Sequence, residues 1–179
     1  MSPEAFAIRD HAFELVSGSG LFQTVKNSIV QQMEPGDQFP AATVFLLREV
    51  RVPDGDANHG EPRFVNDLTL GVVITIDSGD QNRLESVLAD YTNRTINLIL
   101  TDPDFVADLE GIVGLSESQS FPPSGETYYG EARVEMTVQY RTKFEPLVED
   151  DFLRTRITTR PINHPDAPAI RTTINHRQP

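Results

Sequence analysis

The chain has 179 residues, a formal charge of −12, 38% hydrophobic residues, no cysteine and no tryptophan. This length predicts one domain with an extension, and it allows a hydrophobic core without metal or disulfide support. The absence of cysteine excludes disulfides, thiolate catalysis and cysteine-ligated zinc, and the negative charge opposes general binding to nucleic acid.

The first predicted element is an amphipathic helix over residues 3–17. Ser2 is a suitable N-cap, and Pro3 suits the first helical position. The apolar residues at helical spacing are Ala5, Ile8, Ala12, Leu15 and Val16. The next stretch, residues 21–33, fits either a helix or a strand. Glycines before it and a Pro-Gly pair after it favour the strand.

Three further strands are predicted from apolar patterning. The stretch 43–50 is apolar on both faces, which indicates burial on both sides for part of its length. A long hairpin loop rich in Gly, Asp and Asn follows at 53–62. Residues 68–77 and 132–141 alternate apolar and polar side chains, as expected of strands with one face on a core.

A second helix is expected at 80–101, between these two alternating strands. Asp80 is a suitable cap, and Pro103 ends the helix. The side chains expected on its inner face are Leu84, Val87, Leu88, Tyr91, Thr95, Leu98 and Ile99. We expect residues 102–127 to form an irregular connection.

The periodic pattern stops after Phe144, and a proline-rich stretch follows. We therefore predict an α+β domain over residues 1–145 and an extended C-terminal arm over 146–179. The domain is expected to hold a mainly antiparallel sheet packed with two helices, plus the long hairpin loop. Residues 153–179 carry five arginines and one aspartate, a charge of +4, so the other 152 residues carry −16.

The sequence contains no recognisable catalytic or metal-binding motif. None of the four histidines, His11, His59, His164 and His176, has metal-ligand spacing, and each is expected to be a solvated surface side chain. Asp54, Asp56 and Asn58 resemble the start of a calcium loop. His59 then stands where the turn glycine is needed, and Val65 stands where the glutamate belongs. We predict no catalytic residue, metal or cofactor.

Several segments, in order, resemble the tail terminator family of tailed bacteriophages, also called tail completion or minor tail proteins. The segments are Ala7-Ile8-Arg9-Asp10 in the first helix, Phe39-Pro40-Ala41-Ala42-Thr43-Val44-Phe45-Leu46, Arg63-Phe64 with Leu68-Thr69-Leu70-Gly71-Val72-Val73-Ile74, Leu100-Thr101-Asp102-Pro103, and Gly130-Glu131-Ala132-Arg133-Val134-Glu135-Met136-Thr137-Val138-Gln139-Tyr140-Arg141-Thr142. The resemblance covers residues 4–145, and short members of the family lack the 145–179 arm.

The resemblance implies a non-enzymatic virion protein of the tail or neck, made in the host cytoplasm. It would form a hexameric ring that caps the tail tube and meets the head-to-neck proteins, and in contractile tails the sheath. DNA would pass through the lumen without specific binding, and no membrane partner is expected. The charge of −16 separately suggests that acidic side chains line part of this lumen. The partner-binding candidates are Asp54, Asp56, His59 and Glu61 in the loop and Arg154, Arg156, Arg160 and Arg171 in the arm.

Two alternatives remain open at this point. The first is another neck or head–tail joining protein, since such proteins share small α+β modules. The second is a small-ligand enzyme or binding domain on a similar fold, because fold alone does not determine function.

Overall fold

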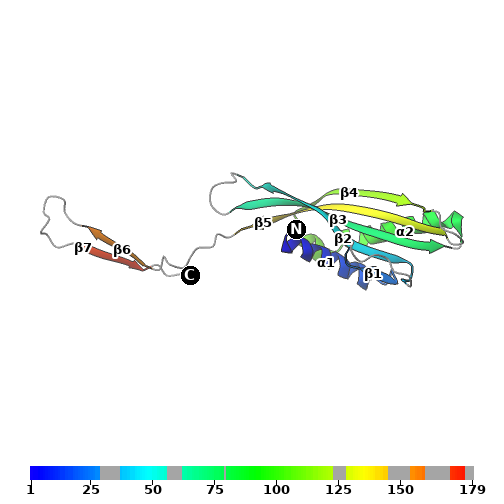
Figure 1. Ribbon diagram of the computed structural model, residues 1–179, viewed down its shortest axis with the longest axis horizontal. Helices are drawn as coiled ribbons and strands as arrows, with labels where there is room; N and C mark the ends of the chain where they lie inside the picture. Colours follow the sequence, from blue (N-terminus) through cyan, green and yellow to red (C-terminus); the bar gives the residue numbers. More distant parts are fainter. Residues whose placement is uncertain are drawn as a thin grey trace. The chain divides into compact units, whose positions relative to one another are not determined.

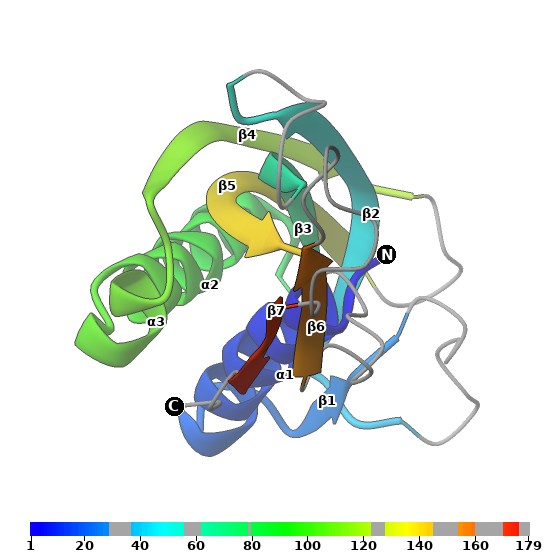
Figure 2. The same ribbon diagram turned by 90° about the vertical axis from the view of Figure 1, so that its left-hand side faces the viewer.

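The sequence folds into an α+β architecture in which helices cover one face of a curved sheet (Figures 1 and 2). The computed structural model describes residues 1–28, 37–55, 62–78, 80–122, 128–144, 154–159 and 170–175. The chain divides into two compact units, Met1–Phe144 and Glu145–Pro179. The α+β fold class expected from the sequence is confirmed.

The first unit contains a five-stranded sheet of order β1-β2-β3-β5-β4. Its strands are β1 (Thr24–Lys26), β2 (Ala41–Pro53), β3 (Arg63–Ser78), β4 (Gly111–Ser120) and β5 (Tyr128–Lys143). The short β1 runs parallel to β2, and all other neighbours are antiparallel. The long strands β3 and β5 form the centre of the sheet, and β1 and β4 are its outermost strands (Figure 1).

The described residues of this unit include three helices: α1 (Pro3–Gly18), α2 (Gln81–Leu100) and α3 (Pro103–Ala107). Each begins at a side chain that caps it, since Ser2, Asp80 and Asp102 accept hydrogen bonds from backbone N–H groups in the first turn. The α1 helix packs on β2, and α2 packs on β3 and β5. No helix in the described part of the chain is long and apolar enough to cross a membrane.

The core lies between the helices and the sheet. Alternate residues of the two central strands are buried there, as their period-two pattern predicted. These strand residues are Leu68, Leu70, Val72, Ile74 and Ile76 in β3 and Ala132, Val134, Met136, Val138 and Tyr140 in β5. The helices contribute Ala5, Ile8, Ala12, Val16, Leu84, Leu88, Ile96 and Ile99.

One aromatic side chain is buried on the opposite face of the sheet. Phe45 is 2% exposed, and its ring lies over Gly71 of the neighbouring strand. The Arg133 guanidinium stands 5.7 Å from the centre of the same ring. Val44, the residue before Phe45, faces the helices, so β2 is buried on both faces here, as its sequence predicted.

The expectation that residues 102–127 form an irregular connection is wrong. This segment contains α3 and the ten-residue strand β4. Nine of the ten β4 residues pair with β5, but a bulge between Ile112 and Gly114 interrupts the alternation, and most side chains are exposed. Burial therefore imposes no periodic pattern on this strand, and local sequence reasoning missed it.

The inner face expected for α2 is correct only in part. Leu84, Leu88, Thr95 and Ile99 are buried, whereas Val87 is 37% exposed. Thr92 and Ile96 are buried instead, and the Thr92 hydroxyl donates to the carbonyl of Leu88. A threonine can thus occupy the inner face because its hydroxyl is satisfied within the helix.

Two other expectations can be compared with the structure only in part. Within the described portion of the strand expected at 21–33, residues 21–28, only β1 is a strand, and residues 29–36 lie outside the described residues. Within the arm, β6 (Arg154–Thr159) and β7 (Ile170–Asn175) pair as antiparallel strands. The sequence did not indicate this pairing, because neither segment has an alternating apolar pattern.

Candidate functional site

A buried polar network connects the start of α1 to two strands of the sheet. The Glu49 side chain, in β2, is only 4% exposed and accepts hydrogen bonds from three partners. The Tyr140 hydroxyl of β5 donates at 2.6 Å, the Ser2 backbone N–H at 2.8 Å, and the Arg51 guanidinium at 3.1 and 3.2 Å. Ser2 also caps α1 and shares a 2.8 Å hydrogen bond with Tyr140.

The network keeps the Glu49 carboxyl group deprotonated and the Tyr140 hydroxyl group protonated near neutral pH. Burial alone would raise the pKa of Glu49, but the hydrogen bonds from Arg51, Tyr140 and Ser2 outweigh it and lower the pKa to about 2. Burial and the bond to Glu49 raise the pKa of Tyr140 to about 12. Neither group exchanges a proton near neutral pH, so the arrangement is suited to fixing α1 rather than to acid–base catalysis.

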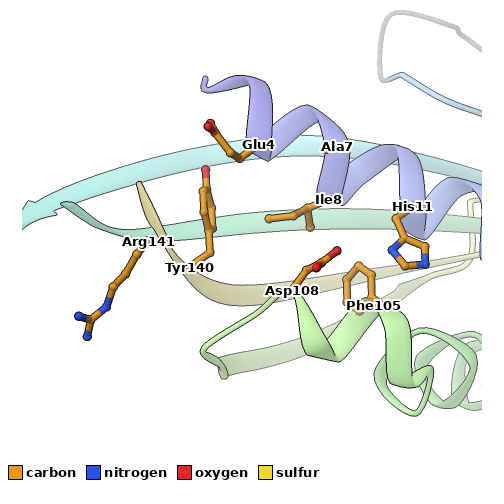
Figure 3. Close-up of a pocket in the computed structure, with 8 residues that line it drawn as sticks. All are labelled: Glu4, Ala7, Ile8, His11, Phe105, Asp108, Tyr140 and Arg141. Carbon is orange, nitrogen blue, oxygen red and sulfur yellow. The ribbon is translucent and has the colours of Figure 1, made fainter. Parts of the chain in front are cut away.

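A cavity of about 300 Å³ lies beside this network, between α1 and α3 and over β5 (Figure 3). It is lined by Glu4, Ala7, Ile8, His11, Phe105, Asp108, Tyr140 and Arg141. Glu4, His11 and Asp108 supply polar groups around an apolar floor. In Figure 3 the Arg141 guanidinium points away from the cavity.

His11 is not the solvated surface side chain that the sequence suggested. It is half-buried, and its ring packs edge to face against the Phe105 ring, with 5.6 Å between the ring centres. Its Nε2 atom lies 3.7 Å from the Asp102 carboxylate, which also caps α3. Since α3 was not predicted, the packing of His11 against its first turn was not foreseeable.

The base of the loop between β2 and β3 is fixed by a second group of charges. The Asp54 N–H donates to the Arg63 carbonyl at 2.9 Å and closes the hairpin. The Asp54 carboxylate accepts from Arg141 at 2.9 Å, and Arg141 also forms an ion pair with Glu110. Asp54, Arg63, Arg141, Thr142 and Lys143 line a second cavity of about 370 Å³.

The residues selected from the sequence for partner binding fall into three groups. Asp54 is placed at the base of the loop, where Arg141 holds it. Arg154 and Arg156 belong to β6, and Arg171 belongs to β7. The remaining candidates, Asp56, His59, Glu61 and Arg160, lie outside the described residues.

The residues that organise this end of the sheet were missed by sequence reasoning. Strand pairing across large sequence separations brings Tyr140 to Glu49 and Arg141 to Asp54, and the sequence offers no local signal for either contact. Among the described residues, no group of three or more His, Asp or Glu side chains is arranged to hold a metal ion. No protein-family model matches the chain, and the comparison with curated proteins finds no match.

Proposed function

We propose that this chain is a non-enzymatic structural protein of a phage virion, a tail terminator. Copies of it form a hexameric ring that caps the finished tail tube, stops tube polymerisation and joins the tail to head or neck proteins. The observation that carries the proposal is the placement of the resembling segments. All of them belong to the one α+β unit, Met1–Phe144, where they form α1, β2, β3, the end of α2 and β5.

The anchored hairpin between β2 and β3 supports a role in contacts with the tube or the neck. Loops held on a rigid scaffold are the usual carriers of binding residues. Here the scaffold is two paired strands, closed at Asp54–Arg63 and fastened by Arg141. Asp54, Asp56, His59 and Glu61 are the proposed contact residues of this loop.

The distribution of charge supports passage of DNA without retention. Residues 1–152 carry −16, and like charge keeps a polyanion mobile, whereas a basic lining would trap it through counterion release. The acidic surface of this region is proposed to line part of the ring's lumen. The basic segment, residues 153–179, is proposed to contact the next subunit or, in a contractile tail, the sheath.

One observation favours a different class of function. The 300 Å³ cavity between α1 and α3 has the size of a small-ligand site and holds a half-buried histidine. Against catalysis, the neighbouring Tyr140–Glu49 pair does not titrate near neutral pH. A head–tail joining protein of similar fold is the structural alternative.

Molecular mass in solution and negative-stain images of the full chain test the proposal. A terminator forms rings of about six copies, either free or at the ends of purified tail tubes, and added protein stops further tube growth. A monomer that binds no tube end and leaves tube growth unchanged would exclude this function. The joining-protein alternative predicts binding to head connectors instead of tubes.

A further inference from the structure

Strand β4 leaves one edge of the sheet open. It pairs with β5 from Gly111 opposite Gln139 to Ser120 opposite Glu131, and it is the last strand in the sheet order. In the described part of the chain no strand lies beyond it. A ten-residue strand therefore presents a row of backbone N–H and C=O groups to any strand that approaches.

This edge strand also exposes apolar side chains. Ile112 is 39% exposed, Val113 is 55% exposed and Leu115 is 45% exposed. The helices pack elsewhere, since α1 covers β2 and α2 covers β3 and β5. The strand has one charged residue, Glu117, and lacks the lysines and prolines with which edge strands are commonly protected against pairing.

The second unit contains a two-stranded sheet that needs a further strand or a packed face. Among the residues that the structure describes in this unit, β6 and β7 form a two-stranded antiparallel sheet with six residues in each strand. An isolated two-stranded hairpin is at best marginally stable in water, and a third strand or a packed face is needed to stabilise it. Both outer edges of such a hairpin are available for pairing.

We propose that the β6–β7 hairpin of one copy adds to the free edge of β4 in a second copy, so that a single sheet continues across the interface. This inference rests on the proposed function in one respect. Donation of a hairpin from each copy to the next is a head-to-tail contact, which closes when the copies form a ring. Strand addition supplies main-chain hydrogen bonds and uses the apolar side chains of β4 as anchors.

Length and charge fit this occupant. A six-residue strand of the hairpin is shorter than β4, so the whole strand can pair along its edge. Nine residues, 145–153, separate Phe144 from β6, and a chain of nine residues spans at most roughly 30 Å at about 3.3 Å per residue. Residues 153–179, which contain the hairpin, carry +4 and the rest of the chain −16, so donor and acceptor attract each other.

Disulfide trapping between two different copies tests the proposal directly, because the chain has no native cysteine. One pool of full-length protein carries a cysteine on β4, with Ser116→Cys, Ser118→Cys and Ser120→Cys made in turn. The other pool carries Thr155→Cys in β6 or Thr173→Cys in β7. After mixing and mild oxidation, a disulfide between the pools can form only between copies.

We expect at least one β4–hairpin pair to give a disulfide-linked dimer. A cysteine at the exposed Asn93 of α2 is the matched control, and it should not cross-link to the hairpin. Leu115→Lys adds a charge to the β4 edge and should abolish the cross-link. Val87→Lys, at a comparably exposed apolar position of α2, should leave it intact.

Three results would overturn the inference. They are equal cross-linking to β4 and α2, no cross-link from any β4 position, and cross-links confined within one chain when both cysteines are present. Circular dichroism of Leu115→Lys separates a blocked edge from a misfolded sheet. Rings that form without β4–hairpin cross-links would exclude this interface and keep the terminator function. Cross-linked open chains that never cap tubes would support this interface and exclude the terminator function.

Discussion

The Tyr140 hydroxyl donates a 2.6 Å hydrogen bond to the Glu49 carboxylate, and the two residues are 91 positions apart in the sequence. The bond reaches from β5 to β2 across β3, the strand between them. Both side chains also bind Ser2, whose hydroxyl caps α1. The first helix is therefore held to the sheet at its N-terminus by a buried polar network as well as by its apolar face.

Replacement of Glu49 should reveal this network through the pH dependence of stability. The pKa of Glu49 in the folded protein is about 2, below its ordinary value of 4.5. The carboxylate therefore stabilises the fold above about pH 4.5, and this contribution is lost as the pH falls through about 2. Glu49→Gln should lower the free energy of unfolding by about 1–3 kcal/mol at pH 7.

Urea unfolding of both proteins between pH 7 and pH 2 measures the effect. The difference in stability between wild type and Glu49→Gln should shrink from about pH 4.5 downward. Glu14→Gln, at an exposed position of α1, is the control and should change stability little at any pH. A constant difference across the whole pH range would contradict the assigned role of Glu49.

Addition of one carbon at Gly71 should destabilise the sheet. A Cβ atom there would stand 2.6 Å from two ring carbons of Phe45, whose side chain is buried. Gly71→Ala is expected to lower the free energy of unfolding by about 1–3 kcal/mol. Gly111→Ala is the control, because nothing lies within 4 Å of the added carbon.

A double-mutant cycle with Phe45→Leu identifies the cause. The smaller side chain leaves room for the alanine, so the double variant should be more stable than the sum of the two single effects predicts. A coupling free energy of about 0.5–3 kcal/mol is expected for residues in such contact. Strictly additive effects would mean that strand backbone preferences, and not the ring of Phe45, decide the outcome.

Sequence reasoning succeeded where one burial pattern persists over many residues. The strands β3 and β5 and the helices α1 and α2 each bury one face over several turns or repeats, and all four were predicted. It failed for β4, which exposes most side chains and is defined by its partner β5. The Glu49–Tyr140 pair was missed for the same reason, since only tertiary structure brings the residues together.

Replacement of Val72 by aspartate tests the direction of the β3 face. Val72 is fully buried among the core residues, so Val72→Asp would place a carboxylate without partners in an apolar region. We expect a loss of about 4 kcal/mol or more, with aggregation during expression. Val52→Asp, at a 53% exposed position of β2, should express normally. If Val72→Asp melts at the wild-type temperature, the face assignment is wrong.

Deletion of residues 55–60 tests the role of the β2–β3 loop. The paired strands and the Asp54–Arg63 hydrogen bond lie outside the deleted segment, so the unfolding temperature should stay close to that of the wild type. Under the proposed function, tube capping should be lost, because the loop carries contacts with the tail or neck. Electron microscopy of tubes mixed with the deleted protein counts capped ends, and capping at the wild-type level would remove this role.

Removal of residues 153–179 tests the basic segment as a whole. The core of the first unit lies entirely within Met1–Phe144, so the truncated chain should fold with an unchanged far-ultraviolet spectrum from that unit. The lost segment carries +4 against the −16 of the rest of the chain, and arginine pairs well with carboxylates.

Truncation should therefore weaken assembly. Exposed ion pairs contribute only about 0–1 kcal/mol each, so the loss should be large only if several act together with strand addition. Salt separates the two contributions, since ion pairs between copies are screened within about 10 Å at 0.1 M ionic strength. The intact protein should assemble less as salt rises, whereas the truncated protein should assemble weakly at all salt concentrations. Sedimentation from 0.05 to 1 M NaCl measures the assembly of both proteins as a function of salt. Identical assembly at every salt concentration would show that this segment takes no part in it.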